Sequence, residues 1–128
     1  MKKNVIYFKR KVYDAMLRWK KERNGATALL IQGARRIGKS TIAEQFAQRE
    51  YESYILIDFS IAPKEITDLF QDISDLNYIF VKLQLFYQVN LKERKSVIVF
   101  DEVQKQPLAR QAIKHLVKDG RYDYIETG

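Results

Sequence analysis

The hydrophobic positions along this chain follow two different periods. Runs of consecutive apolar residues predict buried strands at 27–32, 53–59 and 96–100, and a fourth strand closes the chain at 122–128. Between these runs, apolar residues recur every three to four positions, which is typical of amphipathic helices. Strands that alternate with helices predict an α/β fold with a parallel sheet and right-handed crossover connections.

Five segments have the helical period. The expected helices are residues 12–23, 39–50, a segment opened by Pro63, 76–90, and a segment that runs from Pro107 to a stop at Gly120. Proline suits a first helical turn, because the N–H that it lacks would be unpaired there anyway. In the helix at 76–90, we expect Phe86 to face the core together with Phe80 and Leu83.

The composition limits the class of protein. With 128 residues, of which 46% are hydrophobic, the chain can build one core but not two ordinary domains. Cysteine is absent, so no disulfide framework or thiolate metal site is possible. The N-terminus lacks the apolar region of a signal peptide, and no run of 18 apolar residues occurs. We therefore expect a cytoplasmic protein that has no membrane partner.

The positive charge is concentrated at the N-terminus. Residues 1–23 contain nine Lys or Arg and two acidic residues, which accounts for the net charge of +7, and the other 105 residues contain 14 of each sign. Such a segment can bind nucleic acid through residues 2–23, or it can simply be the solvated face of a helix. We divide the chain into a basic N-terminal segment with an amphipathic helix, 1–25, and a core, 26–128.

The stretch "GARRIGKS" at 33–40 matches the pattern G-x-x-x-x-G-K-[ST], with a predicted strand before it and a predicted helix after it. Consecutive backbone N–H groups in such a turn form a concavity for a polyphosphate, and Gly33 and Gly38 allow it to approach closely. The helix that begins near Lys39 directs its positive dipole end at the same anion. The alternative is a glycine turn with a solvated lysine.

We expect Lys39 to reach the β- and γ-phosphates and the Ser40 hydroxyl to ligate Mg²⁺. Arg35 and Arg36 occupy free positions of the pattern; we expect them to be solvated or paired with acids, and we give them no individual role. The nucleotide-binding residues of the loop are Gly33, Ala34, Arg35, Arg36, Ile37, Gly38, Lys39 and Ser40.

Two acidic residues, Asp101 and Glu102, follow the apolar run "SVIVF". Ligands bind at the carboxyl ends of strands in open α/β sheets, and an aspartate there can hold Mg²⁺ opposite Ser40. The next carboxylate is placed to accept a proton from a water that attacks the γ-phosphate. Alternatively, the two residues are an ordinary strand-end aspartate and an exposed loop acid. Small-molecule kinases share the loop but have less need of Glu102, because the hydroxyl of their substrate is the nucleophile.

The segments "ALLIQGARRIGKSTI", "SVIVFDEVQ" and "YDYIETG" together resemble the prokaryotic AAA-type ATPases, which are P-loop ATPases with an added glutamate in the Walker B motif. The resemblance runs from Val12 to the last residue. It implies a three-layer fold with strands in the order 27–32, 122–128, 96–100, 53–59, and a fifth strand beside 27–32. It also implies ATP and Mg²⁺ as cofactors, with Thr41 next to the α-phosphate, Ser40 and Asp101 as Mg²⁺ ligands and Glu102 as the catalytic residue.

The end of the chain departs from this family pattern. The family has a polar sensor residue at or just after the tip of the last strand here, then a fifth strand and usually an arginine finger that acts on a neighbouring subunit. The sensor is either Thr127 or the residue that would follow Gly128. We expect a shortened form of a longer protein, in which 27–32 is an unpaired apolar edge that favours self-association or a protein partner.

The leading functional prediction is Mg²⁺-ATP binding and hydrolysis, impaired in this chain. Two alternatives stay open: a nucleotide-binding interaction module with little hydrolysis, and a nucleic-acid-handling ATPase that uses the basic N-terminal segment.

Overall fold

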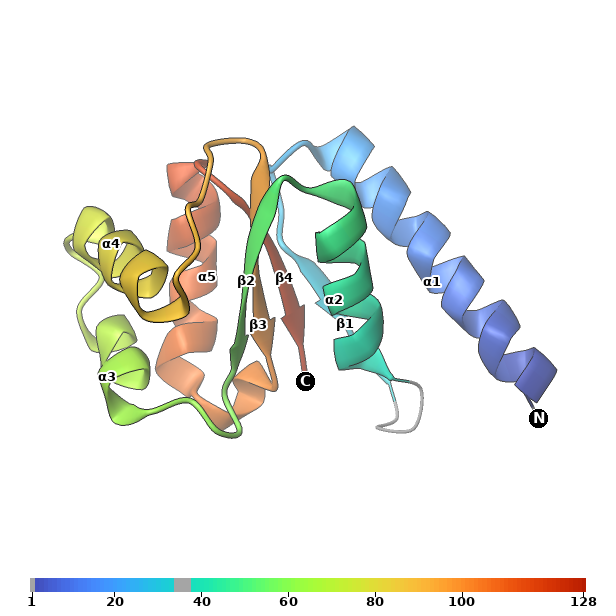
Figure 1. Ribbon diagram of the computed structural model, residues 1–128, viewed down its shortest axis with the longest axis horizontal. Coiled ribbons are helices and arrows are strands. Elements are labelled where there is room, and N and C mark those ends of the chain that lie inside the picture. Colours follow the sequence, from blue (N-terminus) through green and yellow to red (C-terminus); the bar gives the residue numbers. More distant parts are fainter. Residues whose placement is uncertain (1, 34–37) are drawn as a thin grey trace.

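The computed structural model describes residues 2–33 and 38–128, and the side chains of residues 7–33 and 38–128. A central sheet is covered by α1 and α2 on one face and by α3, α4 and α5 on the other (Figure 1). The elements are α1 (Lys2–Arg23), β1 (Leu29–Ile31), α2 (Lys39–Glu50), β2 (Ser53–Asp58), α3 (Lys64–Thr67), α4 (Leu76–Tyr87), β3 (Ser96–Asp101), α5 (Pro107–Asp119) and β4 (Asp123–Thr127).

The sheet has four strands in the order β1-β4-β3-β2, and every pair is parallel. The predicted fold class and strand order are therefore confirmed. The register places Asp58 beside Asp101 and Ile31 beside Thr127, so the carboxyl ends of all four strands lie at one edge of the sheet. The described residues form no fifth strand, and β1 is an outer strand whose Leu30 is 39% exposed. Self-association through β1 stays a prediction.

The core lies on both faces of the sheet, because successive side chains of a strand point to opposite faces. Strand β3 is buried along its whole length. Its residues Ile98 and Phe100 pack with Ile55, Ile57 and Tyr124 on the α5 side. Its residues Val97 and Val99 pack on the α2 side with Ile31, Ile42, Ala43, Phe46 and Ile125. Full burial of each large apolar side chain is worth about 1.5–3 kcal/mol. Because β3 contributes buried side chains to both faces of the sheet, it lies at the centre of the core.

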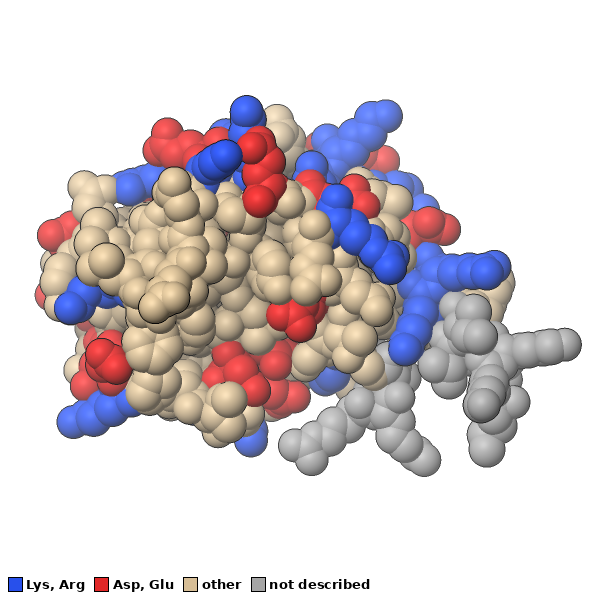
Figure 2. All heavy atoms as spheres, in the orientation of Figure 1, with Lys and Arg blue, Asp and Glu red and all other residues tan. Residues whose placement is uncertain are grey.

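Helix α1 begins at Lys2, ten residues before the predicted start at residue 12. Apolar periodicity underestimated its length, because the apolar residues before Val12, at 5–8, are consecutive and do not repeat at helical spacing. Among the described side chains of α1, Met16 and Trp19 pack on the core. No glycine or proline interrupts residues 2–12, so the helix can extend through them. Blue Lys and Arg side chains gather over α1 in Figure 2. The division into 1–25 and 26–128 stays a prediction.

Two other helix predictions were partly wrong. The segment after Pro63 is helical only over α3 and then tightens into a 3₁₀ turn, Asp68–Gln71. Its apolar residues Ile66 and Leu69 are still buried, because a 3₁₀ turn repeats every three residues. Phe86 is 42% exposed instead of facing the core; it lies in the last turn of α4, where its ring meets Tyr87 edge-on at 4.9 Å.

A buried polar cluster joins the segments at the start of β4. Asp123 is 5% exposed, and its carboxylate accepts hydrogen bonds from Tyr51 Oη at 2.5 Å and from Arg94 Nη2 at 2.6 Å. Burial, together with the neighbouring Asp123 carboxylate, raises the pKa of Tyr51 far above its usual value, so this hydroxyl stays a donor. The cluster stabilises the end of the sheet opposite to the predicted site.

Within the part of the chain that the structure describes, no helix is both long enough and apolar enough to span a membrane.

Candidate functional site

The predicted phosphate-binding loop ends at the start of α2. Gly38 precedes this helix with φ 71° and ψ 44°, a left-handed conformation that glycine adopts without strain. Among the described residues no side chain caps the helix there, and its first turn contains no acidic residue. The first backbone N–H groups of α2 therefore receive no hydrogen bond acceptor from a described side-chain cap. The positive end of the helix dipole is likewise not balanced by an acidic residue in the first turn. Ala34, Arg35, Arg36 and Ile37 lie outside the described residues, so their predicted roles stay predictions.

Lys39 is the first residue of α2 and is only 9% exposed. Within the described residues it takes part in none of the ion pairs. Its positive charge therefore lies at the positive end of the α2 dipole, and no described acidic side chain is paired with it. This end of α2 is therefore suited to a negatively charged ligand.

Three predicted side chains meet at the carboxyl edge of the sheet. Ser40 Oγ donates a hydrogen bond of 2.6 Å to Oδ1 of Asp101, the last residue of β3. Thr127 Oγ1, from the end of β4, donates to the same oxygen at 2.6 Å. Asp101 is 5% exposed and Thr127 is fully buried. Asp101 thus connects the start of α2 with two adjacent strands, as its predicted role beside Ser40 requires.

Glu102 follows in a left-handed conformation, φ 57° and ψ 41°, which costs a residue with a side chain about 1–3 kcal/mol. Its backbone N–H donates to Thr127 Oγ1 at 3.0 Å, which helps to hold this turn. Its carboxylate accepts a hydrogen bond of 2.6 Å from Gln104 Nε2. Gln104 was missed by the sequence analysis; the only signal was an amide two residues after a proposed catalytic acid.

A cleft of about 410 Å³ opens beside this cluster, between α2 and the ends of β2 and β3. Its lining includes Ser40, Thr41 and Asp101, three of the predicted residues, together with Glu44 and Asp58. Ser40 Oγ and Asp101 Oδ1 are hard oxygen donors 2.6 Å apart, close to the spacing of about 3 Å between adjacent ligands of octahedral Mg²⁺. The pair therefore fits the predicted Mg²⁺ site.

Among the described residues, no group of three or more His, Cys, Asp and Glu side chains could hold a metal ion.

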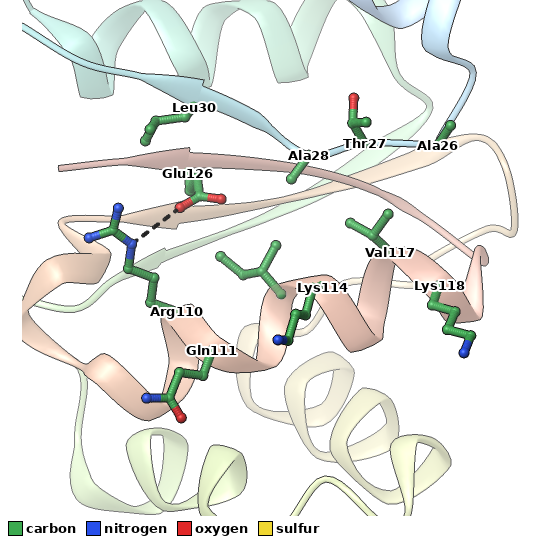
Figure 3. Close-up of a pocket in the computed structure, with 11 residues that line it drawn as sticks. Ala26, Thr27, Ala28, Leu30, Arg110, Gln111, Lys114, Val117, Lys118 and Glu126 are labelled. Carbon is green, nitrogen blue, oxygen red and sulfur yellow. Dashed lines mark ion pairs between the residues drawn. The ribbon is translucent and has the colours of Figure 1, made fainter.

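A cavity larger than this cleft lies elsewhere. A groove of about 990 Å³ runs between β1, β4 and α5, and none of the predicted site residues lines it (Figure 3). Arg110 Nε lies 3.9 Å from Glu126 Oε1 across this groove. Burial raises the pKa of Glu126, and the Arg110 charge partly opposes the shift. The groove offers apolar surface beside the outer strand β1. The predicted phosphate-binding groups lie instead at α2 and β3, so we place the candidate functional site at α2 and β3.

Replacing Thr127 by valine tests the hydrogen bonds that hold Asp101 and Glu102. The variant keeps the shape of the side chain, but Asp101 loses one donor and the Glu102 N–H loses its acceptor. We expect a loss of about 1–3 kcal/mol in the free energy of unfolding, measured by urea denaturation. Thr67→Val is the control, because the Thr67 hydroxyl makes only an exposed hydrogen bond. Equal stability of the two variants would contradict a clamping role for Thr127.

Comparison with known proteins adds one match. A family model described as an AAA domain matches residues 25–128, which include the predicted phosphate-binding loop and all four strands of the sheet. Searches of curated proteins and of solved structures found no significant match.

Proposed function

The chain belongs to this family of AAA domains, which are nucleotide-binding domains of ATPase type, and from this membership we propose that it binds Mg²⁺-ATP and hydrolyses it at the site formed by α2 and β3. The observation that carries the proposal is the hydrogen bond of 2.6 Å between Ser40 and Asp101, one residue from the buried Lys39. Two residues that are 61 positions apart, the proposed Mg²⁺ ligands, thus lie in contact beside the proposed phosphate-binding lysine.

Each side chain has a proposed task. Lys39 and the first N–H groups of α2 bind the phosphate oxygens, and Gly38 lets them approach. Ser40 and Asp101 hold Mg²⁺, which when bound neutralises charge on the β- and γ-phosphate oxygens. Thr127 fixes the Asp101 carboxylate and the backbone of Glu102 through the hydrogen bonds described above. Thr41 lines the same cleft and is proposed to lie near the α-phosphate.

Glu102 is the proposed general base. It accepts a proton from the water whose oxygen bonds to the γ-phosphorus, while the bond between that phosphorus and the oxygen bridging to the β-phosphate breaks. The products are ADP and inorganic phosphate. The hydrogen bond from Gln104 holds the carboxylate but leaves its other oxygen able to accept the proton.

A second candidate is a nucleotide-binding module with little hydrolysis. The hydrogen bond of 2.6 Å between Gln104 and Glu102 favours it, because this bond fixes the direction of the carboxylate, and Glu102 can act as a base only if that direction meets the attacking water. Single-turnover hydrolysis of Mg²⁺-ATP with the enzyme in excess distinguishes the two candidates. Hydrolysis to ADP supports the ATPase, and stoichiometric binding without ADP formation supports the module.

The proposed Mg²⁺ ligands are tested by Ser40→Ala and Asp101→Ala. Each variant should weaken ATP affinity about tenfold or more when Mg²⁺ is present, because a charge-assisted metal contact is lost, and should change it little in EDTA. Titration calorimetry under both conditions gives the comparison. Ser74→Ala, on the exposed loop before α4, is the matched hydroxyl control. A loss of equal size with and without Mg²⁺ would argue against metal ligation.

A further inference from the structure

A lysine of the N-terminal helix reaches the start of α2. A Cβ atom built on Gly38 would lie 3.7 Å from both Cε and Nζ of Lys9. Lys9 is separated from Gly38 by 29 positions in the sequence, and no motif marks it. Its ammonium group nevertheless lies at the glycine that precedes the phosphate-binding lysine, Lys39.

The packing of α1 on α2 directs this side chain. Tyr13, one turn after Lys9, meets the ring of Phe46 edge-on at 5.2 Å, and its hydroxyl donates to Glu50 Oε2 at 2.6 Å. Residues four apart lie on the same side of a helix, so the anchor at Tyr13 turns Lys9 toward α2. Lys9 and Tyr13 also line a groove of about 390 Å³ between the two helices. In Figure 1, α1 passes beside α2 toward the end at which α2 begins.

Positive charge gathers at this point. Lys9 and Lys39 appear in none of the ion pairs among the described residues. Lys39 is nine-tenths buried, and the first turn of α2 has no acidic residue. The Lys9 ammonium group and the positive end of the α2 dipole both favour a negatively charged ligand at Gly38.

We infer that Lys9 is a second phosphate-binding cation, which the N-terminal helix supplies to the nucleotide at the start of α2. The inference rests on the proposed nucleotide site and adds a residue and a form of regulation to it. Because coupling between two binding events is reciprocal, the nucleotide must also stabilise α1 against α2, and a partner that pulled α1 away would weaken nucleotide binding.

The test compares Lys9→Ala with Lys11→Ala in the full chain. Lys11 is a matched control, because it lies on the same helix but places its ammonium group 5.0 Å from the centre of the Tyr7 ring. Titration calorimetry with Mg²⁺-ATP should show about five- to tenfold weaker binding for Lys9→Ala and less than about a twofold change for Lys11→Ala. Lys9→Arg should bind nearly as well as the unaltered chain, since the cation is kept.

Hydrogen exchange provides a second readout. ATP should slow the exchange of backbone amides in residues 8–14 of the unaltered chain and of Lys11→Ala, but not of Lys9→Ala. Equal ATP affinity of the two alanine variants would overturn the inference. It would also be overturned if both variants lost affinity equally for a short duplex DNA and neither lost affinity for ATP, because α1 would then be a nucleic-acid surface.

Different results would contradict the proposed function itself. If the unaltered chain does not bind ATP, or if Lys39→Ala binds it equally well, the nucleotide site itself is wrong. If Lys39→Ala loses binding while Lys9→Ala matches Lys11→Ala, only the role of Lys9 is wrong.

Discussion

Replacing Glu102 by glutamine is expected to lower the rate of ATP hydrolysis by about 10²–10⁴-fold, the usual cost of removing a general base. Glutamine has nearly the same shape and can still hydrogen-bond to Gln104, but it cannot accept the proton of the attacking water. Mg²⁺-ATP affinity should therefore stay within about twofold of the unaltered chain. Single-turnover hydrolysis measures the rate, and titration calorimetry measures the affinity.

The control for this experiment is Glu65→Gln, which makes the same change at an exposed position in the first turn of α3. Its rate should match that of the unaltered chain. If Glu102→Gln also hydrolyses ATP within a few fold of that rate, Glu102 is an ordinary loop acid. A search for a phosphorylated acceptor would then be warranted, since a kinase uses the hydroxyl of its substrate as the nucleophile.

Replacing Lys39 by alanine is expected to weaken ATP affinity about ten- to a hundredfold. The phosphates lose a charge-assisted contact worth about 1.5–3 kcal/mol. The free energy of unfolding of the ligand-free chain should change little, because Lys39 takes part in no ion pair among the described residues. The midpoint of thermal unfolding should therefore be kept without ATP, while the increase that ATP causes is lost.

Lys82→Ala controls for the loss of one positive charge, because Lys82 is exposed on α4, where it lies 5.8 Å from the ring centre of Tyr78. It should bind ATP as the unaltered chain does. Unchanged affinity in Lys39→Ala itself would defeat the phosphate-loop interpretation of residues 33–40.

The parts of the fold that the sequence predicted well are those with strong local signals. The bounds of α2 and of β3 were predicted to within one residue, because a glycine loop starts the helix and a continuous apolar run ends at Asp101. Weaker predictions had competing local signals. Apolar periodicity showed only residues 12–23 of α1, and the helical spacing after Pro63 could not distinguish an α-helix from α3 followed by a 3₁₀ turn.

The candidate site also has parts that the sequence predicted and parts that it did not. The spacing of Gly33, Lys39 and Ser40 and the position of Asp101 after an apolar strand were visible in the sequence. The contact between Ser40 and Asp101, 61 residues apart, followed from the rule that strand ends gather at one edge of a parallel sheet. The sequence left Thr127 and the residue that would follow Gly128 as alternatives for the sensor. The structure adds that the Thr127 hydroxyl joins Asp101 to the backbone of Glu102.

The sequence by itself therefore determined the fold class and, through family resemblance, the strand order. It also predicted the chemical type of the site, because spacing along the chain is enough to specify a loop, a helix start and a strand end. Only the tertiary structure decided which side chains surround those groups. Gln104 reaches Glu102 because a left-handed residue turns the chain after β3, and Lys9 reaches Gly38 because Tyr13 anchors α1 on α2. Such contacts depend on the angle and register at which packed elements meet, and no local pattern of residues encodes these.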